Sequence, residues 1–106
     1  EWFLSVITNR LTGGGLYILD EPESGLSPTR QFAFLVWLRR QAEKQGSQLI
    51  IATHSPILLA YPNATIYELS ESGIDRVEYE GTDHFLLTRD FLNAREHFLR
   101  ELFTDA

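Results

Sequence analysis

Two short apolar runs separated by a long helical stretch constrain the fold of this chain more than any other feature. The first run covers residues 16–19, and the second covers residues 48–53. Between them, Ser27 and Pro28 supply an N-cap and a first helical residue, and Gly46 follows the expected helix end near residue 45. A strand, a helix and a strand joined at this length predict parallel pairing with a right-handed crossover.

Further elements are expected on both sides of this strand–helix–strand unit. They are marked by apolar residues near helical spacing or by apolar–polar alternation. The expected elements are a helix over residues 1–11, a brief helix over 57–61, hairpin strands over 65–69 and 74–79, and helices over 83–92 and 94–103. The sequence therefore predicts an α/β fold, in which a parallel sheet with flanking helices is followed by a C-terminal β-hairpin and helices.

Apolar patterning also predicts where the core lies. The continuous apolar run at residues 16–19 is typical of a strand that is covered on both faces. The long helix carries apolar residues well beyond one stripe, so we expect it to be heavily buried near its middle. Its apolar residues are Phe32, Phe34, Leu35, Val36, Trp37 and Leu38.

Composition limits the class of protein. The 106 residues suffice for one core, and 43% hydrophobic with 23% charged residues is typical of a soluble globular domain. No apolar run approaches the roughly 20 residues of a membrane span. The sequence has no cysteine, which excludes disulfides and fits a reducing cytoplasm. The net charge of −6 argues against bulk attraction to nucleic acid, although a local basic patch stays open.

Polar residues follow both predicted strands of the parallel sheet. Asp20 and Glu21 come directly after the first strand, and His54 comes after the second. In open α/β sheets the ligand lies outside the carboxyl ends of the strands, so these three side chains should converge on one edge. There an Asp could hold Mg²⁺, the next Glu could orient or deprotonate a water, and the His could reach a transferring phosphoryl group.

Each of these residues also has a purely structural interpretation. An acidic pair after a strand is often a solvated turn, and His54 could be a surface residue or the N-cap of the short helix behind it. Ser24, Gly25 and Ser27 could serve only as turn and cap residues. Taken singly, each residue leaves structure and function open.

Taken together, the motifs resemble a known family. LYILDEPESGLSP, followed by LIIATHSP, is similar to the C-terminal half of the ATP-binding cassette (ABC) nucleotide-binding fold. The resemblance is closest to soluble ATPases of that superfamily, of the SMC-like, overcoming-lysogenization-defect-like and AAA_21-like kinds. Residues 16–21 match the Walker B pattern, residues 22–27 occupy the place of the D-loop, and residues 53–55 match the switch-histidine loop. His54 lies 33 positions after Glu21, a separation that suits the family.

The resemblance implies a role for each matching residue. Asp20 would bind Mg²⁺ through water, Glu21 would be the base that polarises the attacking water, and His54 would contact the γ-phosphate of ATP. The loop after the Walker B segment would reach across a head-to-tail homodimer to the partner's nucleotide through Ser24, Gly25 and Leu26. The family's loop commonly ends in Asp, whereas this chain has Ser27 there.

One part of such an ATPase is missing from the sequence. No G-x-x-x-x-G-K-[ST] loop occurs in the 106 residues, so nothing in them is expected to cradle the β- and γ-phosphates. We therefore interpret residues 1–106 as the C-terminal portion of one ABC-type ATPase domain whose N-terminal half lies outside this sequence. The full protein would bind and hydrolyse Mg-ATP at a dimer interface, and residues 1–106 alone would be inactive.

Three other interpretations remain open. ATP could drive dimerisation of a switch module coupled to a DNA-repair, defence or transport partner. A metal-dependent phosphohydrolase or nuclease could use Asp20, Glu21 and His54 directly, but such sites usually need three or more carboxylates, and Glu23 is the obvious further candidate. Residues 1–106 alone could also be an inactive object with a large exposed apolar surface.

Overall fold

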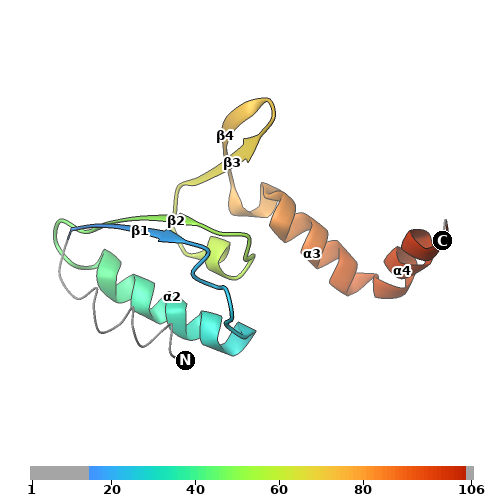
Figure 1. Ribbon diagram of the computed structural model, residues 1–106, viewed down its shortest axis with the longest axis horizontal. Helices are drawn as coiled ribbons and strands as arrows, with labels where there is room; N and C mark the ends of the chain where they lie inside the picture. Colours follow the sequence, from blue (N-terminus) through green and yellow to red (C-terminus); the bar gives the residue numbers. More distant parts are fainter. Residues whose placement is uncertain (1–14, 105–106) are drawn as a thin grey trace. The chain divides into compact units, whose positions relative to one another are not determined.

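The structure is a computed structural model that describes residues 15–104 (Figure 1). The helix expected over residues 1–11 lies outside the described residues. The chain divides into two compact units, Glu1–Pro62 and Asn63–Ala106, and each is described by itself. The described elements are β1 (Leu16–Asp20), α2 (Pro28–Ala42), β2 (Gln48–Ala52), a 3₁₀ helix η1 (Leu58–Ala60), β3 (Ile66–Ser70), β4 (Gly73–Val77), a 3₁₀ helix η2 (Tyr79–Gly81), α3 (Asp83–Asn93) and α4 (Arg95–Phe103).

The first unit is built on two parallel strands joined through a helix. Strands β1 and β2 pair in parallel, with a register that runs from Leu16 opposite Gln48 to Asp20 opposite Ala52. Helix α2 lies against this pair in the ribbon view (Figure 1). The mixed α/β class with a small parallel sheet is therefore confirmed.

Local chemistry sets the two ends of α2. The Ser27 hydroxyl accepts a hydrogen bond from the Arg30 amide at 3.3 Å, and Pro28 follows at the first helical position, as predicted. The helix ends at Ala42, three residues earlier than expected. After Ala42 the chain continues as turns, in which the Lys44 amide donates to the Gln41 carbonyl oxygen at 3.1 Å.

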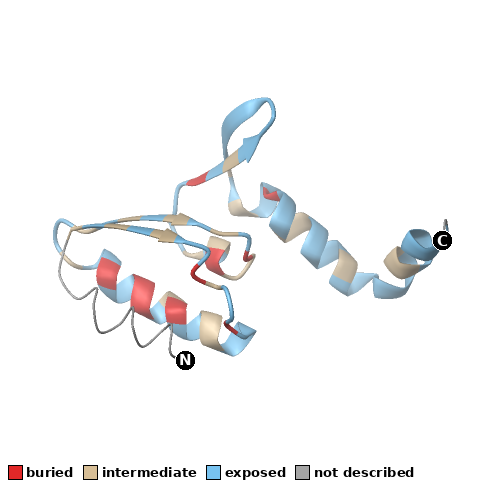
Figure 2. Cartoon of the chain, in the orientation of Figure 1, coloured by how far each residue is buried: buried red, intermediate tan, exposed pale blue. Residues whose placement is uncertain are grey.

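The core of the first unit lies between α2 and the sheet. Phe34, Trp37 and Leu38 of α2 are buried together with Leu26 and Leu58 (Figure 2), and the rings of Phe34 and Trp37 stack at 5.3 Å. The inward-facing strand residues Leu19, Leu49 and Ile51 pack against this cluster. Burial of such side chains contributes about 1.5–3 kcal/mol each.

One expectation about burial is confirmed in part, and a second is wrong among the described residues. The middle of α2 is buried at Phe34, Trp37 and Leu38, but other apolar residues of the helix are exposed. Phe32 and Val36 of α2 are 55% and 52% exposed, because in the described residues the helix contacts its surroundings mainly through its sheet-facing side. Strand β1 is covered on one face only, since its alternate residues Leu16 and Ile18 are 58% and 70% exposed. Ile50 of β2 shares that exposed apolar face.

The second unit begins with the predicted hairpin. Strands β3 and β4 pair antiparallel, with Ile66 opposite Val77 and Ser70 opposite Gly73. Gly73 has a φ of 129°, a conformation that favours glycine, directly after the turn. Strand β4 ends at Val77, and the chain then forms η2, so the second strand is shorter than the predicted 74–79.

Polar caps start the helical part of the second unit. The Thr82 hydroxyl donates to the Tyr79 carbonyl oxygen at 2.9 Å and accepts from the Phe85 amide at 3.2 Å, while a Glu68 carboxylate oxygen accepts from the Asp83 amide at 2.7 Å. Helices α3 and α4 end within one residue of the predicted boundaries. Across residues 15–104, no helix is both long enough and apolar enough to cross a membrane.

Candidate functional site

The paired strands deliver two loops to the same edge of the sheet. Asp20, the last residue of β1, is in register with Ala52, the last residue of β2. The Glu21 amide continues the pairing by donating to the Ala52 carbonyl oxygen at 2.7 Å. The residues that follow each strand therefore start level with one another, as the sequence predicts.

Glu21 adopts a backbone conformation that is unusual for a residue with a side chain. Its φ is 49°, in the left-handed region, and its carbonyl oxygen accepts from the Ser24 amide at 3.0 Å. A non-glycine residue pays roughly 1–2 kcal/mol for this conformation. Such strain is concentrated at functional sites, where it aims a side chain that a relaxed turn would direct elsewhere.

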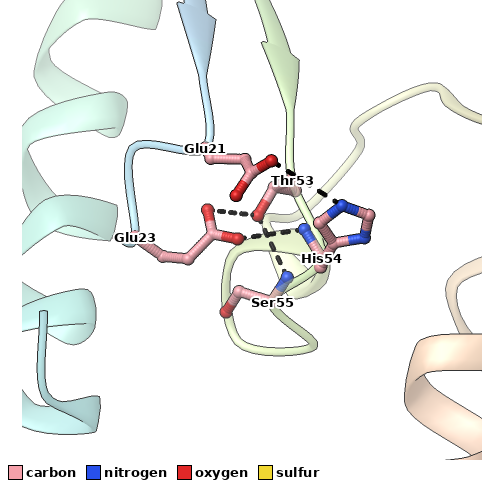
Figure 3. A network of polar contacts seen from close by, with 5 residues as sticks. All are labelled: Glu21, Glu23, Thr53, His54 and Ser55. Atoms are coloured by element: carbon pink, nitrogen blue, oxygen red, sulfur yellow. Dashed lines mark hydrogen bonds and ion pairs between the residues drawn. The ribbon is translucent and has the colours of Figure 1, made fainter. Parts of the chain in front are cut away.

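The Glu21 side chain meets the imidazole of His54. Glu21 Oε2 and His54 Nε2 are 3.9 Å apart (Figure 3), and both side chains are more than half exposed. This contact is an ion pair only when the imidazole is protonated. A carboxylate and an imidazole thus face one solvent-accessible point beyond the carboxyl ends of β1 and β2.

Glu23 supports the loop that carries His54. The Thr53 hydroxyl donates to Glu23 Oε1 at 2.6 Å, and the His54 amide donates to Glu23 Oε2 at 3.0 Å. Partial burial raises the pKa of the Glu23 carboxyl, but these hydrogen bonds, its own amide and the charge of His54 together outweigh burial. The pKa of Glu23 therefore lies below its ordinary value of 4.5. From the sequence, Glu23 is only a further candidate carboxylate for a metal site, and this support of the other loop is not predicted.

The hydrogen bonds of Ser55 and Gln31 are likewise not predicted from the sequence. The Ser55 hydroxyl donates to Gln31 Oε1 at 2.5 Å and accepts from the Ile57 amide at 3.1 Å, and it also accepts from the Leu58 amide at 3.2 Å. Gln31 Nε2 donates in turn to the Leu26 carbonyl oxygen at 3.1 Å. The residue whose side chain accepts from the amides at the start of η1 is therefore Ser55 and not His54. The sequence signal was the His-Ser-Pro order, which places a hydroxyl at the start of the short helix.

The loop after Glu21 separates into exposed and buried residues. Ser24 and Gly25 are exposed, and Gly25 has a φ of 79° that favours glycine. Leu26 is only 8% exposed and belongs to the core of the first unit, so its side chain anchors the loop. Ser27 caps α2.

Asp20 offers an oxygen donor of the kind that Mg²⁺ takes. It is exposed at the strand end, and Mg²⁺ is usually held by one or two carboxylates while keeping several waters. The donor chemistry therefore fits this ion. Within residues 15–104, no group of three or more His, Cys, Asp or Glu side chains could hold a metal by itself, whereas the phosphohydrolase interpretation needs such a group.

Comparison with known proteins adds one finding. A protein-family model matches residues 2–60, more than half of the chain, and is described as "AAA domain, putative AbiEii toxin, Type IV TA system". The matched segment includes both strands of the parallel sheet and the loops that carry Glu21 and His54. No curated protein and no solved structure matches the chain.

Proposed function

Since the chain belongs to this family of AAA domains, we propose that it is the C-terminal portion of an ABC-type ATPase domain which hydrolyses Mg-ATP in the complete protein. Membership itself implies a nucleotide-binding domain of the ATPase type. The finer proposal is supported above all by one observation. Glu21 and His54 lie 3.9 Å apart beyond the carboxyl ends of two parallel strands, where ligands of open α/β sheets bind.

The proposal gives each residue a chemical task. Glu21 accepts a hydrogen bond from the attacking water and polarises it, and His54 donates a hydrogen bond to the γ-phosphate. Asp20 would hold Mg²⁺ through water, and the ion would supply positive charge against the phosphates. Phosphoryl transfer requires mainly positioning and electrostatic stabilisation, which two side chains on level loops can provide.

The exposed turn beside the site is the proposed dimer contact. Ser24 and Gly25 face solvent while Leu26 holds the loop in the core, so the turn can meet a second copy without unpacking the unit. We propose that a head-to-tail homodimer brings this turn to the partner's nucleotide. The same geometry would serve an ATP-driven switch, and turnover distinguishes the two.

The experiment is the Glu21→Gln substitution in the complete protein. Removal of a general base lowers rates by about 10²–10⁴, so we expect turnover to fall by about 100-fold or more. ATP binding should persist, and the ATP-held dimer should accumulate. Glu43→Gln, the same chemical change at the exposed C-cap of α2, is the matched control. Unchanged turnover in Glu21→Gln would remove Glu21 from its proposed role.

A further inference from the structure

The contact between Glu21 and His54 is too weak to fix either side chain. The two atoms are 3.9 Å apart and their side chains are 55% and 69% exposed, and ion pairs between exposed side chains contribute little stability. A reaction that depends on placing an imidazole beside a carboxylate needs a firmer support. In this chain the support acts on the backbone of the loop that carries the imidazole.

We propose that Glu23 is a positioning residue, which fixes His54 relative to Glu21 by holding the loop of residues 53–55 against the loop that follows β1. This inference rests on the proposed function. Glu23 lies two residues after Glu21 on the same turn, and its carboxylate spans to the other loop. One oxygen accepts from the Thr53 hydroxyl at 2.6 Å, and the other accepts from the amide of His54 itself at 3.0 Å (Figure 3).

The contact with Thr53 extends the support by one residue. Thr53 Oγ1 donates to Glu23 and accepts from the Ser55 amide at 3.0 Å, so the residues on both sides of His54 are held through one hydroxyl. Hydrogen bonds to an ionised acceptor are shorter and roughly twice as strong as neutral ones. The 2.6 Å contact has the length expected of such a bond.

A second link holds the far end of the same turn. Gln31 in the first turns of α2 accepts from the buried Ser55 hydroxyl and donates to the Leu26 carbonyl oxygen. The exposed residues Ser24 and Gly25 therefore lie between two links to the histidine loop. A partner that displaces this turn would displace His54 with it.

Two matched pairs of variants in the complete protein test the proposal. Glu23→Ala removes both hydrogen bonds of the link, whereas Thr53→Val removes the bond from the threonine hydroxyl and the acceptor of the Ser55 amide. Thr53→Ser keeps the hydroxyl, and Glu23→Gln keeps an acceptor for the His54 amide while its new amide can donate to the threonine hydroxyl. A role in positioning therefore survives Glu23→Gln, whereas a role as a charged metal ligand or base does not. Glu43→Ala, at the exposed C-cap of α2, is the control.

Two measurements read the result. Hydrogen–deuterium exchange follows the amides of His54 and Ser55, and steady-state kinetics separates kcat from KM for ATP. We expect Glu23→Ala and Thr53→Val to exchange about tenfold faster at these amides. We expect kcat to fall about tenfold or more, because small misplacements of reacting groups are costly, while KM changes by less than about twofold. Glu23→Gln and Thr53→Ser should keep most of the protection and most of kcat.

Each contrary result has a definite meaning. Unchanged exchange in Glu23→Ala overturns the proposal, as does a loss in Glu23→Gln as large as that in Glu23→Ala. Faster exchange with unchanged kcat, in a protein where Glu21→Gln loses turnover, also overturns it and leaves the proposed function standing. Unchanged turnover in Glu21→Gln contradicts the proposed function instead, and the exchange data then decide whether Glu23 holds the loop.

Discussion

The lowered pKa of Glu23 makes the stability of the folded chain depend on pH. Because its carboxylate is hydrogen-bonded in the folded chain, the charged form is favoured there relative to the unfolded chain. A group whose pKa is lowered by folding contributes stability above its ordinary pKa of 4.5 and loses that contribution as the pH falls through the folded value. Acid should therefore reduce the stability that Glu23 contributes through the hydrogen bonds it accepts.

The corresponding prediction compares the wild-type protein with Glu23→Gln, which cannot titrate. The wild-type advantage in free energy of unfolding should shrink below about pH 4.5, as the carboxyl becomes protonated. Urea unfolding of the complete protein at a series of pH values measures it. An advantage that grows on acidification would show that the carboxylate is not stabilised by its partners.

At the same scale, the sequence predicts which side chains converge better than it predicts their hydrogen-bond partners. The convergence of Glu21 and His54 follows from strand direction alone, since both residues come shortly after the carboxyl ends of paired parallel strands. The bonds of Glu23 to Thr53 and of Gln31 to Ser55 span 30 and 24 residues and depend on the conformation of two loops. The left-handed φ of Glu21 sets one of these loops, and no pattern of hydrophobicity encodes it.

At the scale of elements, α2 carries a phenylalanine at a core position and another at a surface position. Phe34 is fully buried against the sheet, whereas Phe32 is 55% exposed. Phe34→Ala should lower the free energy of unfolding by about 3–5 kcal/mol, since it removes buried area and leaves a cavity. Phe32→Ala should cost less than about 1 kcal/mol. Denaturant unfolding of the complete protein compares the two, and equal losses would contradict the one-sided packing of this helix.

The same helix shows why burial was only partly predictable. Apolar residues that extend well beyond one stripe of the helix indicate contacts on several sides. Among the described residues, however, only its sheet-facing side is covered. The outer face of β1 and β2 is likewise apolar and exposed at Leu16, Ile18 and Ile50. The sequence shows that a side chain is apolar, whereas its burial depends on which other segments pack against it.

At the scale of the whole molecule, the family match and the division of the structure agree. The match ends at residue 60, and the first unit ends at Pro62. The ATPase-type assignment therefore belongs to the first unit, which contains all the residues proposed for the site. The second unit has its own hairpin and a helix, α3, that is capped by Thr82. Among its described residues only Ile66 and Thr82 are buried. Its apolar helix residues Leu87, Leu92, Leu102 and Phe103 remain exposed.

The whole-molecule prediction concerns binding of ATP by residues 1–106 alone. In the proposed function Glu21, His54 and Asp20 act on the water, the γ-phosphate and Mg²⁺. The 106 residues contain no glycine-rich loop with a following Lys-Ser/Thr to hold the phosphate chain. Without that loop the expected dissociation constant for Mg-ATP is weaker than about 1 mM, a free energy of binding smaller than about 4 kcal/mol. Isothermal titration calorimetry compares residues 1–106 with the complete protein, and circular dichroism checks that the shorter chain is folded. Micromolar binding by the folded shorter chain would mean that it holds ATP without a Walker A loop, and would contradict its assignment as the portion of the domain that lacks phosphate binding.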